Sequence, residues 1–213
     1  MDKIDYKKSN KELYQPKTEP GIIDVPAMTF IQVNGYGNPN DPEGEYQKAV
    51  ETLYALSYTI KMSPKNGPAP HGYFEYVVPP LEGLWWQEGL RGVDLMSKDT
   101  FSWTAMIRQP DFVNEQVFAA AVEAVKRKKP QVDVSKAGLV TFTEGLCVQC
   151  MHIGSFDDEP ATVAKMNRYI AEHDLLCDLS DVRRHHEIYL SDPRKTETAK
   201  LKTILRHPVR QAR

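Results

Sequence analysis

The sequence predicts an α+β protein in which a strand-helix-strand-strand unit occurs twice, as a pseudo-twofold duplication with antiparallel sheets, helices on one face and a ligand cleft between the halves. Segments of β-strand and helical character follow one another in the same order in both halves. A helical segment between Pro110 and Pro130 separates the halves. The turn Gly35-Tyr36-Gly37 of the first half also has a counterpart in Gly154-Ser155-Phe156 of the second.

The length of 213 residues suits one sizeable core, so we expect a single domain at residues 21–213. Residues 1–20 are polar and rich in lysine, and we expect them to form an N-terminal arm or lid rather than core. Within the domain, we expect a first repeat at about residues 22–110, a linking helix at about 111–130 and a second repeat at about 140–210.

The first half is expected to contain a strand, a helix and two further strands. Residues 28–34 are rich in β-forming side chains and run into a turn-forming cluster at 35–42. Residues 43–62 carry apolar side chains at steps of three and four, which predicts a helix that lies on a sheet. Residues 72–78 and 100–107 predict the two remaining strands.

The second half repeats this order. Residues 146–153 predict a strand, and a helix that starts near Pro160 is indicated by apolar side chains at helical steps. Residues 185–190 and 201–205 predict the last two strands. In the duplication, we expect the segment Phe74-Glu75-Tyr76 to correspond to His186-Glu187-Ile188.

Composition and charge argue against several classes of protein. A formal net charge of −2 and a pI near 6.3 disfavour nucleic acid as a partner. No run of about 18 apolar residues occurs, and the first residues lack the apolar stretch of a signal peptide, so we expect no membrane contact and a cytoplasmic location. The three cysteines fit a reducing compartment.

No metal or cofactor is expected. Cys147 and Cys150 stand three residues apart in a predicted strand and therefore point to opposite faces, which favours a structural role over a shared zinc ion. The six histidines show no paired metal-ligand spacing. Phosphate-binding glycine patterns, the nucleophile elbow and the dinucleotide fingerprint are also missing from the sequence.

The strand at 185–190 carries the main candidate site. Alternation along a strand places His185, Glu187 and Tyr189 on one face, opposite the face that can pack on helices. If the duplication holds, Tyr73 and Glu75 form a matching set, and Glu75 and Glu187 approach one pocket from opposite sides. A glutamate in an aromatic cleft can accept a proton near neutral pH, bind a cation or bind a ligand N–H. The alternative is a glutamate on a solvated strand face.

Tryptophans are placed where they could line this cleft. Trp85 and Trp86 fall in the predicted loop after the Glu75 strand, and Trp103 lies on the following strand. Flat apolar ligands suit such walls. Trp103 could equally belong to the core, and at least one of the adjacent Trp85 and Trp86 is expected at the rim or on a lid.

Several motifs together resemble the GyrI-like family. They are Glu82-Gly83-Leu84-Trp85-Trp86, Met106-Ile107-Arg108-Gln109-Pro110, Cys147-Val148-Gln149, Met151-His152-Ile153-Gly154 and the block from His185 through Tyr-Leu-Ser-Asp to Pro193. The resemblance covers roughly Pro20 to Arg210. It implies a duplicated fold with a pocket between the halves, as in the effector domains of multidrug-responsive regulators, which bind lipophilic drugs around a central glutamate that Glu187 matches. The chain differs from those regulators in that its sequence shows no DNA-binding domain.

The resemblance extends to stand-alone members that hydrolyse cyclopropanoid genotoxins without a cofactor. It implies that Glu187 acts as general base on a water molecule that opens the strained ring, while a phenol protonates the dienone oxygen. Tyr189, or a helix tyrosine such as Tyr54 or Tyr58, is the candidate donor. The ligand is then a lipophilic aromatic small molecule. The alternative is a non-catalytic protein that sequesters drugs or inhibits a protein partner such as gyrase.

Overall fold

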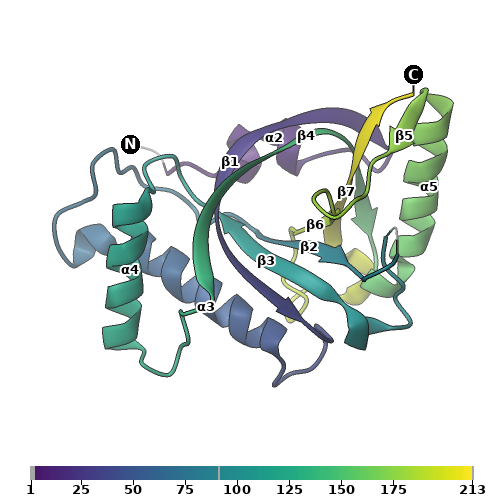
Figure 1. Ribbon diagram of the computed structural model, residues 1–213. Coiled ribbons are helices and arrows are strands. Elements are labelled where there is room, and N and C mark those ends of the chain that lie inside the picture. The colour runs from purple at the N-terminus through teal and green to yellow at the C-terminus, as the bar shows by residue number, and fades with distance from the viewer. Residues whose placement is uncertain (1–2, 91, 213) are drawn as a thin grey trace.

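The computed structural model describes residues 3–90 and 92–212 and confirms the α+β fold class (Figure 1). Its strands are β1 (Gly21–Tyr36), β2 (Leu81–Trp86), β3 (Ser102–Arg108), β4 (Ala137–Ile153), β5 (Leu175–Cys177), β6 (His185–Tyr189) and β7 (Lys202–Gln211). Its α-helices are α1 (Tyr6–Ser9), α2 (Lys11–Tyr14), α3 (Glu45–Lys61), α4 (Glu115–Lys128) and α5 (Glu159–Glu172). No helix among the described residues is long and apolar enough to cross a membrane.

The sheet closes on itself. Its strand order is β4-β1-β3-β2-β6-β7, and β7 pairs again with β4, so every strand of this set has two neighbours. All of these pairings are antiparallel, and the short β5 adds to the far end of β7. The unit β1-α3-β2-β3 is therefore followed by β4-α5-β6-β7, and the two units meet where β2 pairs with β6 and where β1 pairs with β4.

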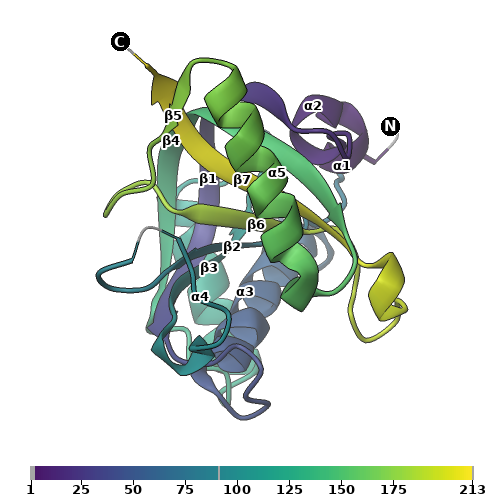
Figure 2. The same cartoon turned by 90° about the vertical axis from the view of Figure 1, so that its right-hand side faces the viewer.

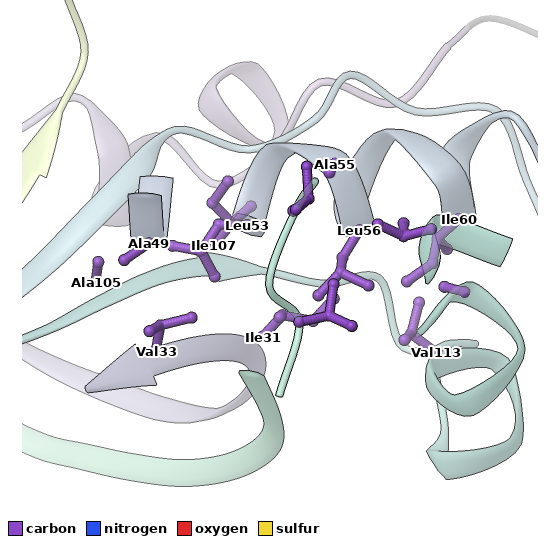
Figure 3. Close-up of a cluster of buried hydrophobic side chains, with 14 of the residues drawn as sticks. Ile31, Val33, Ala49, Leu53, Ala55, Leu56, Ile60, Ala105, Ile107 and Val113 are labelled. Carbon is purple, nitrogen blue, oxygen red and sulfur yellow. The ribbon is translucent and has the colours of Figure 1, made fainter. Parts of the chain in front are cut away.

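The long helices α3 and α5 pack on the outer face of the closed sheet (Figures 1 and 2). Leu53 and Leu56 of α3 are fully buried, and they belong to one apolar cluster with Ile31 of β1 and Ile107 of β3 (Figure 3). Burial of such a stripe, rather than helix propensity, supplies most of a helix's stability. The linking helix of the sequence prediction is α4, which packs beside α3.

The second unit uses the same packing with different residues. Met166 and Ile170 of α5 lie in a cluster with Val148 and Cys150 of β4 and Leu205 of β7. The helix starts at Glu159, and Pro160 stands at its first turn, where a missing N–H costs nothing. Helices α3 and α5 therefore lie on the same side of the sheet and leave β2 and β6 between them (Figure 2).

The predicted strand at residues 72–78 is wrong. Only Tyr76 makes a β-bridge, to Ile4, and the pairing stops there. Aromatic side chains of this segment pack instead on Phe112, and Pro79 and Pro80 cannot donate a ladder hydrogen bond. The strand of this unit is β2 (Leu81–Trp86), in the segment that the sequence placed in a loop. Glu75 therefore does not correspond to Glu187.

The N-terminal arm contributes to the core instead of lying outside it. Leu13 and Tyr14 of α2 are 4% and 1% exposed, and they join Phe30, Met106 and Ile204 in the cluster inside the closed sheet. A hydrogen bond also holds the arm against the sheet, because Arg206 donates to the Leu13 carbonyl at 3.2 Å. The sequence prediction was wrong here because residues 1–20 are mostly polar and only a few apolar side chains among them enter the core.

Charged side chains occupy the interior of the closed sheet beside this cluster. The His186 ring lies between two carboxylates, with Nδ1 3.1 Å from Glu144 and Nε2 3.0 Å from Glu82. Arg206 donates to Glu144 at 2.9 Å, and the Tyr14 hydroxyl donates to Glu82 at 3.3 Å. Two cations thus face two anions, which is the condition for tolerating buried charge.

These ion pairs shift the pKa values of their members. Burial opposes the carboxylate of Glu144, but His186 and Arg206 outweigh it and lower its pKa to about 2. Burial likewise opposes the charged form of His186, while Glu144 and Glu82 raise its pKa to about 9. The ring is therefore a cation across the neutral range.

Replacing Leu13 with alanine should lower the free energy of unfolding by about 2–5 kcal/mol, because it leaves a cavity at the buried end of the arm. Urea denaturation measures the change. The control Lys11→Ala alters an exposed side chain of the same short helix and should stay within about 0.5 kcal/mol of the parent. Equal midpoints for both variants would contradict a core role for the arm.

Replacing His186 with glutamine should cost about 3–5 kcal/mol at weakly acidic pH, because two buried carboxylates lose their shared cation. The raised pKa of His186 means that its contribution is complete below about 6.5 and is lost as the pH rises through about 9. The difference in unfolding free energy between parent and variant should therefore shrink over that range. His71→Gln, at an exposed histidine, is the control, and a pH-independent difference for His186→Gln would refute the ion pairs.

Candidate functional site

A cleft of about 970 Å³ lies on the outer face of the sheet, over β2 and β6 and beside α3. Helix α3 presents three tyrosines to the cleft as one stripe, because their spacings of eight and four residues keep them on one helix face. They are Tyr46, Tyr54 and Tyr58. Trp85 and Phe156 supply further aromatic surface. The cleft is thus an open space with aromatic walls, which suits a flat apolar ligand.

Glu187 lies in the floor of this cleft. It belongs to β6, is 8% exposed and faces the same side as its direct partner on β2, Gly83. The Tyr189 hydroxyl donates to Oε2 at 2.8 Å, and the His185 ring nitrogen Nε2 lies 3.1 Å from Oε1. His185, Glu187 and Tyr189 therefore share one face of the strand, as expected. This face is not opposite the long helices, however, because α3 lines the same cleft, whereas Ile188 of the other face belongs to the interior cluster.

Tyr189 is held from two sides. Its hydroxyl accepts a hydrogen bond from the Trp85 indole N–H at 2.9 Å and donates its own proton to Glu187. Burial raises the pKa of the Tyr189 hydroxyl well above its usual value, and the Glu187 charge adds to the effect. The phenol therefore stays protonated and acts as a fixed donor to the carboxylate.

Gly83 makes this arrangement possible. A Cβ at this position would lie 2.6 Å from Trp85 Nε1 and 3.1 Å from the Tyr189 hydroxyl. The first distance is too short for an added methyl group, and the second is a tight contact that the hydroxyl could relieve only by moving. The strand residue directly opposite Glu187 is therefore small because the indole and the phenol meet above it.

A pair of histidines lies behind Glu187. His185 Nδ1 is 2.7 Å from His207 Nε2, and both rings are buried. Burial and the neighbouring His185 lower the pKa of His207 to about 3, so this ring is neutral. Among the described residues, His207 Nδ1 has no partner. The hydrogen-bond network then assigns His207 Nε2–H as donor to His185, and His185 Nε2–H as donor to Glu187.

Glu159 is a second carboxyl group at the cleft, and sequence reasoning missed it. It is the first residue of α5 and is only 3% exposed. Burial raises its pKa well above the usual value, with further contributions from the charges of Glu187 and Asp157. In the sequence it stands in a turn before Pro160, where a glutamate is an ordinary helix-start residue, so no local signal marks it.

Glu159, His185 and Glu187 each offer an oxygen or nitrogen ligand atom, and these atoms lie within 4.8 Å of one another. Carboxylate and imidazole donors suit a divalent cation. Here, however, His185 Nε2 and both oxygens of Glu187 already take part in hydrogen bonds to one another and to Tyr189. Metal binding would have to replace that network.

A second cavity of about 630 Å³ adjoins the cleft on the α5 side. Glu159 lines both cavities, whereas His185 and His207 line only the second. The carboxyl group of Glu159 therefore stands at the boundary between an aromatic cleft and a smaller space along α5.

The structure brings some of the predicted site residues to the cleft and leaves others away from it. Those that line it are Tyr54, Tyr58, Trp85, Glu187 and Tyr189, with His185 directly behind Glu187. The other four predicted residues do not line the cleft; they are Tyr73, Glu75, Trp86 and Trp103.

Each of the four has other surroundings. Glu75 is exposed, and Tyr73 donates to the Lys61 carbonyl at 2.8 Å. Trp103 is buried in the core at 1% exposure, beneath Gly35. Trp86 points away from Trp85, as expected for neighbours on a strand, and the Arg184 guanidinium stacks on it at 4.5 Å.

The chain matches a known domain family over most of its length. The family of GyrI-like small molecule binding domains matches residues 18–210. Among proteins with curated functions, none matches the chain.

Solved structures from Listeria innocua are similar over 98% of this chain and 100% of their own. One is described as a hydrolase, with 49% identity and a TM-score of 0.89, and another as an uncharacterized conserved protein, with 51% identity and a TM-score of 0.93. The C-terminal domain of EcmrR has 10% identity and a TM-score of 0.54 over 91% of this chain and 98% of that domain, so it shares the fold alone.

Replacing Tyr189 with phenylalanine should lower the free energy of unfolding by about 1–3 kcal/mol, because it leaves the buried Trp85 N–H without an acceptor and removes a donor from Glu187. Chemical denaturation measures the loss. Tyr36→Phe removes a hydroxyl from a tyrosine that is 59% exposed and should have almost no effect. Similar stabilities for the two variants would contradict the bonding around Tyr189.

Proposed function

The chain belongs to the GyrI-like small-molecule-binding domain family, and from this premise we propose that it binds lipophilic aromatic molecules in the cleft beside α3 and hydrolyses a cyclopropanoid ring there. The observation that carries the proposal is Glu187, a carboxylate held in the floor of an aromatic cleft by two fixed donors. Similarity to Listeria structures described as hydrolases, at 49% and 50% identity, supports turnover in addition to binding.

In the proposed reaction, Glu187 removes a proton from a water molecule as the water oxygen bonds to a cyclopropane carbon. The carbon–carbon bond to the six-membered ring breaks, and its electron pair moves through the dienone to the oxygen. That oxygen takes a proton and becomes a phenol, so the ring becomes aromatic. One base and one proton donor therefore complete the reaction.

The hydrogen bonds of Tyr189 favour another tyrosine as the proton donor. Tyr189 already donates a hydrogen bond to Glu187 and accepts one from Trp85, so we assign it the role of positioning the base. In a spiro-cyclopropyl dienone, the oxygen lies at the far end of the six-membered ring from the carbon that water attacks. Tyr54 and Tyr58 stand further along the α3 wall of the cleft than Tyr46 does, and we assign the donor to one of them.

Tyr54 fits this role better than Tyr58. Its side chain is partly buried against the apolar cluster of the first unit, whereas Tyr58 is 49% exposed. Burial raises the pKa of the Tyr54 hydroxyl, with the neighbouring Tyr58 adding to it, so the phenol keeps its proton at neutral pH. The two rings stack at 6.2 Å between centroids and can cover one face of a bound aromatic ring together.

Replacing Glu187 with glutamine should slow the loss of the dienone chromophore of a cyclopropyl-dienone alkylating agent by about 10²–10⁴-fold, since the general base is removed. Calorimetric affinity for the ring-opened phenol product should change far less, because the aromatic walls remain. The matched control is Glu75→Gln, which removes an exposed carboxylate outside the cleft and should leave the rate unchanged.

Two outcomes would contradict the proposal in different ways. Unchanged turnover by Glu187→Gln would exclude this residue as the base. Tight binding by the parent protein without loss of the chromophore would instead identify a protein that sequesters its ligand.

A further inference from the structure

Two buried carboxyl groups from separate elements meet at the edge of the cleft. Glu159 comes from the start of α5 and Glu187 from β6, and both are less than one-tenth exposed. Their nearest ligand-type oxygens lie within 4.8 Å. Two carboxylates this close and this dry do not both ionise without a counter-ion, and such a pair holds one proton between them.

The hydrogen bonds of the two groups decide where this proton lies. Glu187 accepts from Tyr189 at one oxygen and from His185 at the other, and both donors suit a carboxylate. Glu159 Oε1 has no partner among the described residues, although the side chain is buried. The charge is therefore supported on Glu187 and unsupported on Glu159.

Other charged groups near Glu159 act in the same direction or are occupied elsewhere. Asp157, in the short 3-10 turn Phe156–Asp158 before α5, adds a second negative charge and raises the pKa of Glu159 further, after burial and Glu187. Lys98 opposes it, but its amine is bonded to Asp157 at 2.7 Å. The remaining titratable neighbours on β6 are Tyr189, which is protonated, and His185, whose N–H is directed to Glu187.

We infer that Glu159 is a neutral carboxylic acid that donates a hydrogen bond into the cleft, so that the site selects ligands with an uncharged acceptor such as a carbonyl oxygen over ligands with an ammonium group. An ammonium group beside Glu159 would meet a neutral acid, and both oxygens of the ionised Glu187 already accept hydrogen bonds from Tyr189 and His185. A carbonyl oxygen instead accepts the proton that Glu159 already carries. The inference rests on the cleft of the proposed function as a binding site, but it needs no turnover.

The protonation state can be tested by infrared difference spectroscopy of the parent against Glu159→Gln at neutral pH. The parent should show the C=O stretch of a carboxylic acid, which a carboxylate lacks, and the variant should lose it. Glu75→Gln, at an exposed glutamate, should leave the band in place. A parent protein without the band would overturn the inference.

Ligand selectivity can be tested by calorimetry with two probes that share one aromatic body, 2-acetylnaphthalene and 2-naphthylmethylammonium. The ketone should bind the parent about three- to tenfold more tightly than the amine, which corresponds to one hydrogen bond. Its affinity should fall as the pH rises and Glu159 ionises. Glu159→Gln keeps a neutral donor, so ketone affinity should become independent of pH there.

Three outcomes of the binding experiments would overturn the inference. One is preferred binding of the amine, with affinity that rises with pH. Another is Mn²⁺ binding that is lost in Glu159→Gln, which would make Glu159, His185 and Glu187 a cation site. The third is an identical pH dependence of ketone binding in parent and Glu159→Gln. Because none of these measurements involves hydrolysis, failure of the proposed reaction would leave them unaffected.

Discussion

The register of β6 is the constraint on which the rest of the site depends. Its residues alternate between the inside of the closed sheet and the cleft, so His186 meets Glu82 and Glu144 while Glu187 faces outward. A slip of one residue would bring Glu187 into the interior and His186 into the cleft. The interior ion pairs hold the ring at one position, and they thereby fix the place of the carboxylate on the opposite face. An interaction out of reach of any ligand thus defines the binding geometry.

The two faces of β6 treat charge in opposite ways. Inside, the cations His186 and Arg206 balance the anions Glu82 and Glu144. The lowered pKa of Glu144 and the raised pKa of His186 both favour the charged form of the side chain. At the cleft, Glu187 is instead stabilised by hydrogen bonds with Tyr189 and His185, and among the described residues no lysine or arginine forms an ion pair with it. Imbalance of this kind is costly for folding and is common where ligands bind. A single strand therefore separates the interior ion pairs from the hydrogen bonds at the cleft.

Sequence reasoning found what depends on local periodicity and missed what depends on distant partners. Alternation along the strand placed Glu187 and Tyr189 correctly relative to each other, because that pattern needs only neighbouring residues. It placed the matching strand at 72–78 because an extended aromatic segment and a paired strand have the same composition, and because Gly83 interrupts the apolar pattern of β2. Glu159 and His207 reach the site only through the packing of α5 and the pairing of β7, which no local pattern reveals.

Gly83 has a consequence for how this duplicated fold can recognise a molecule. At the paired positions Gly83 and Glu187, one unit supplies a carboxylate and the other supplies no side chain. The two ends of the cleft therefore differ, although the strand-helix-strand-strand framework is nearly symmetric. A ligand bound in the reverse orientation would therefore place its other end beside the Glu187 carboxylate. The orientation of a bound ligand therefore depends in part on a missing side chain, because only one of the two paired positions carries a carboxylate.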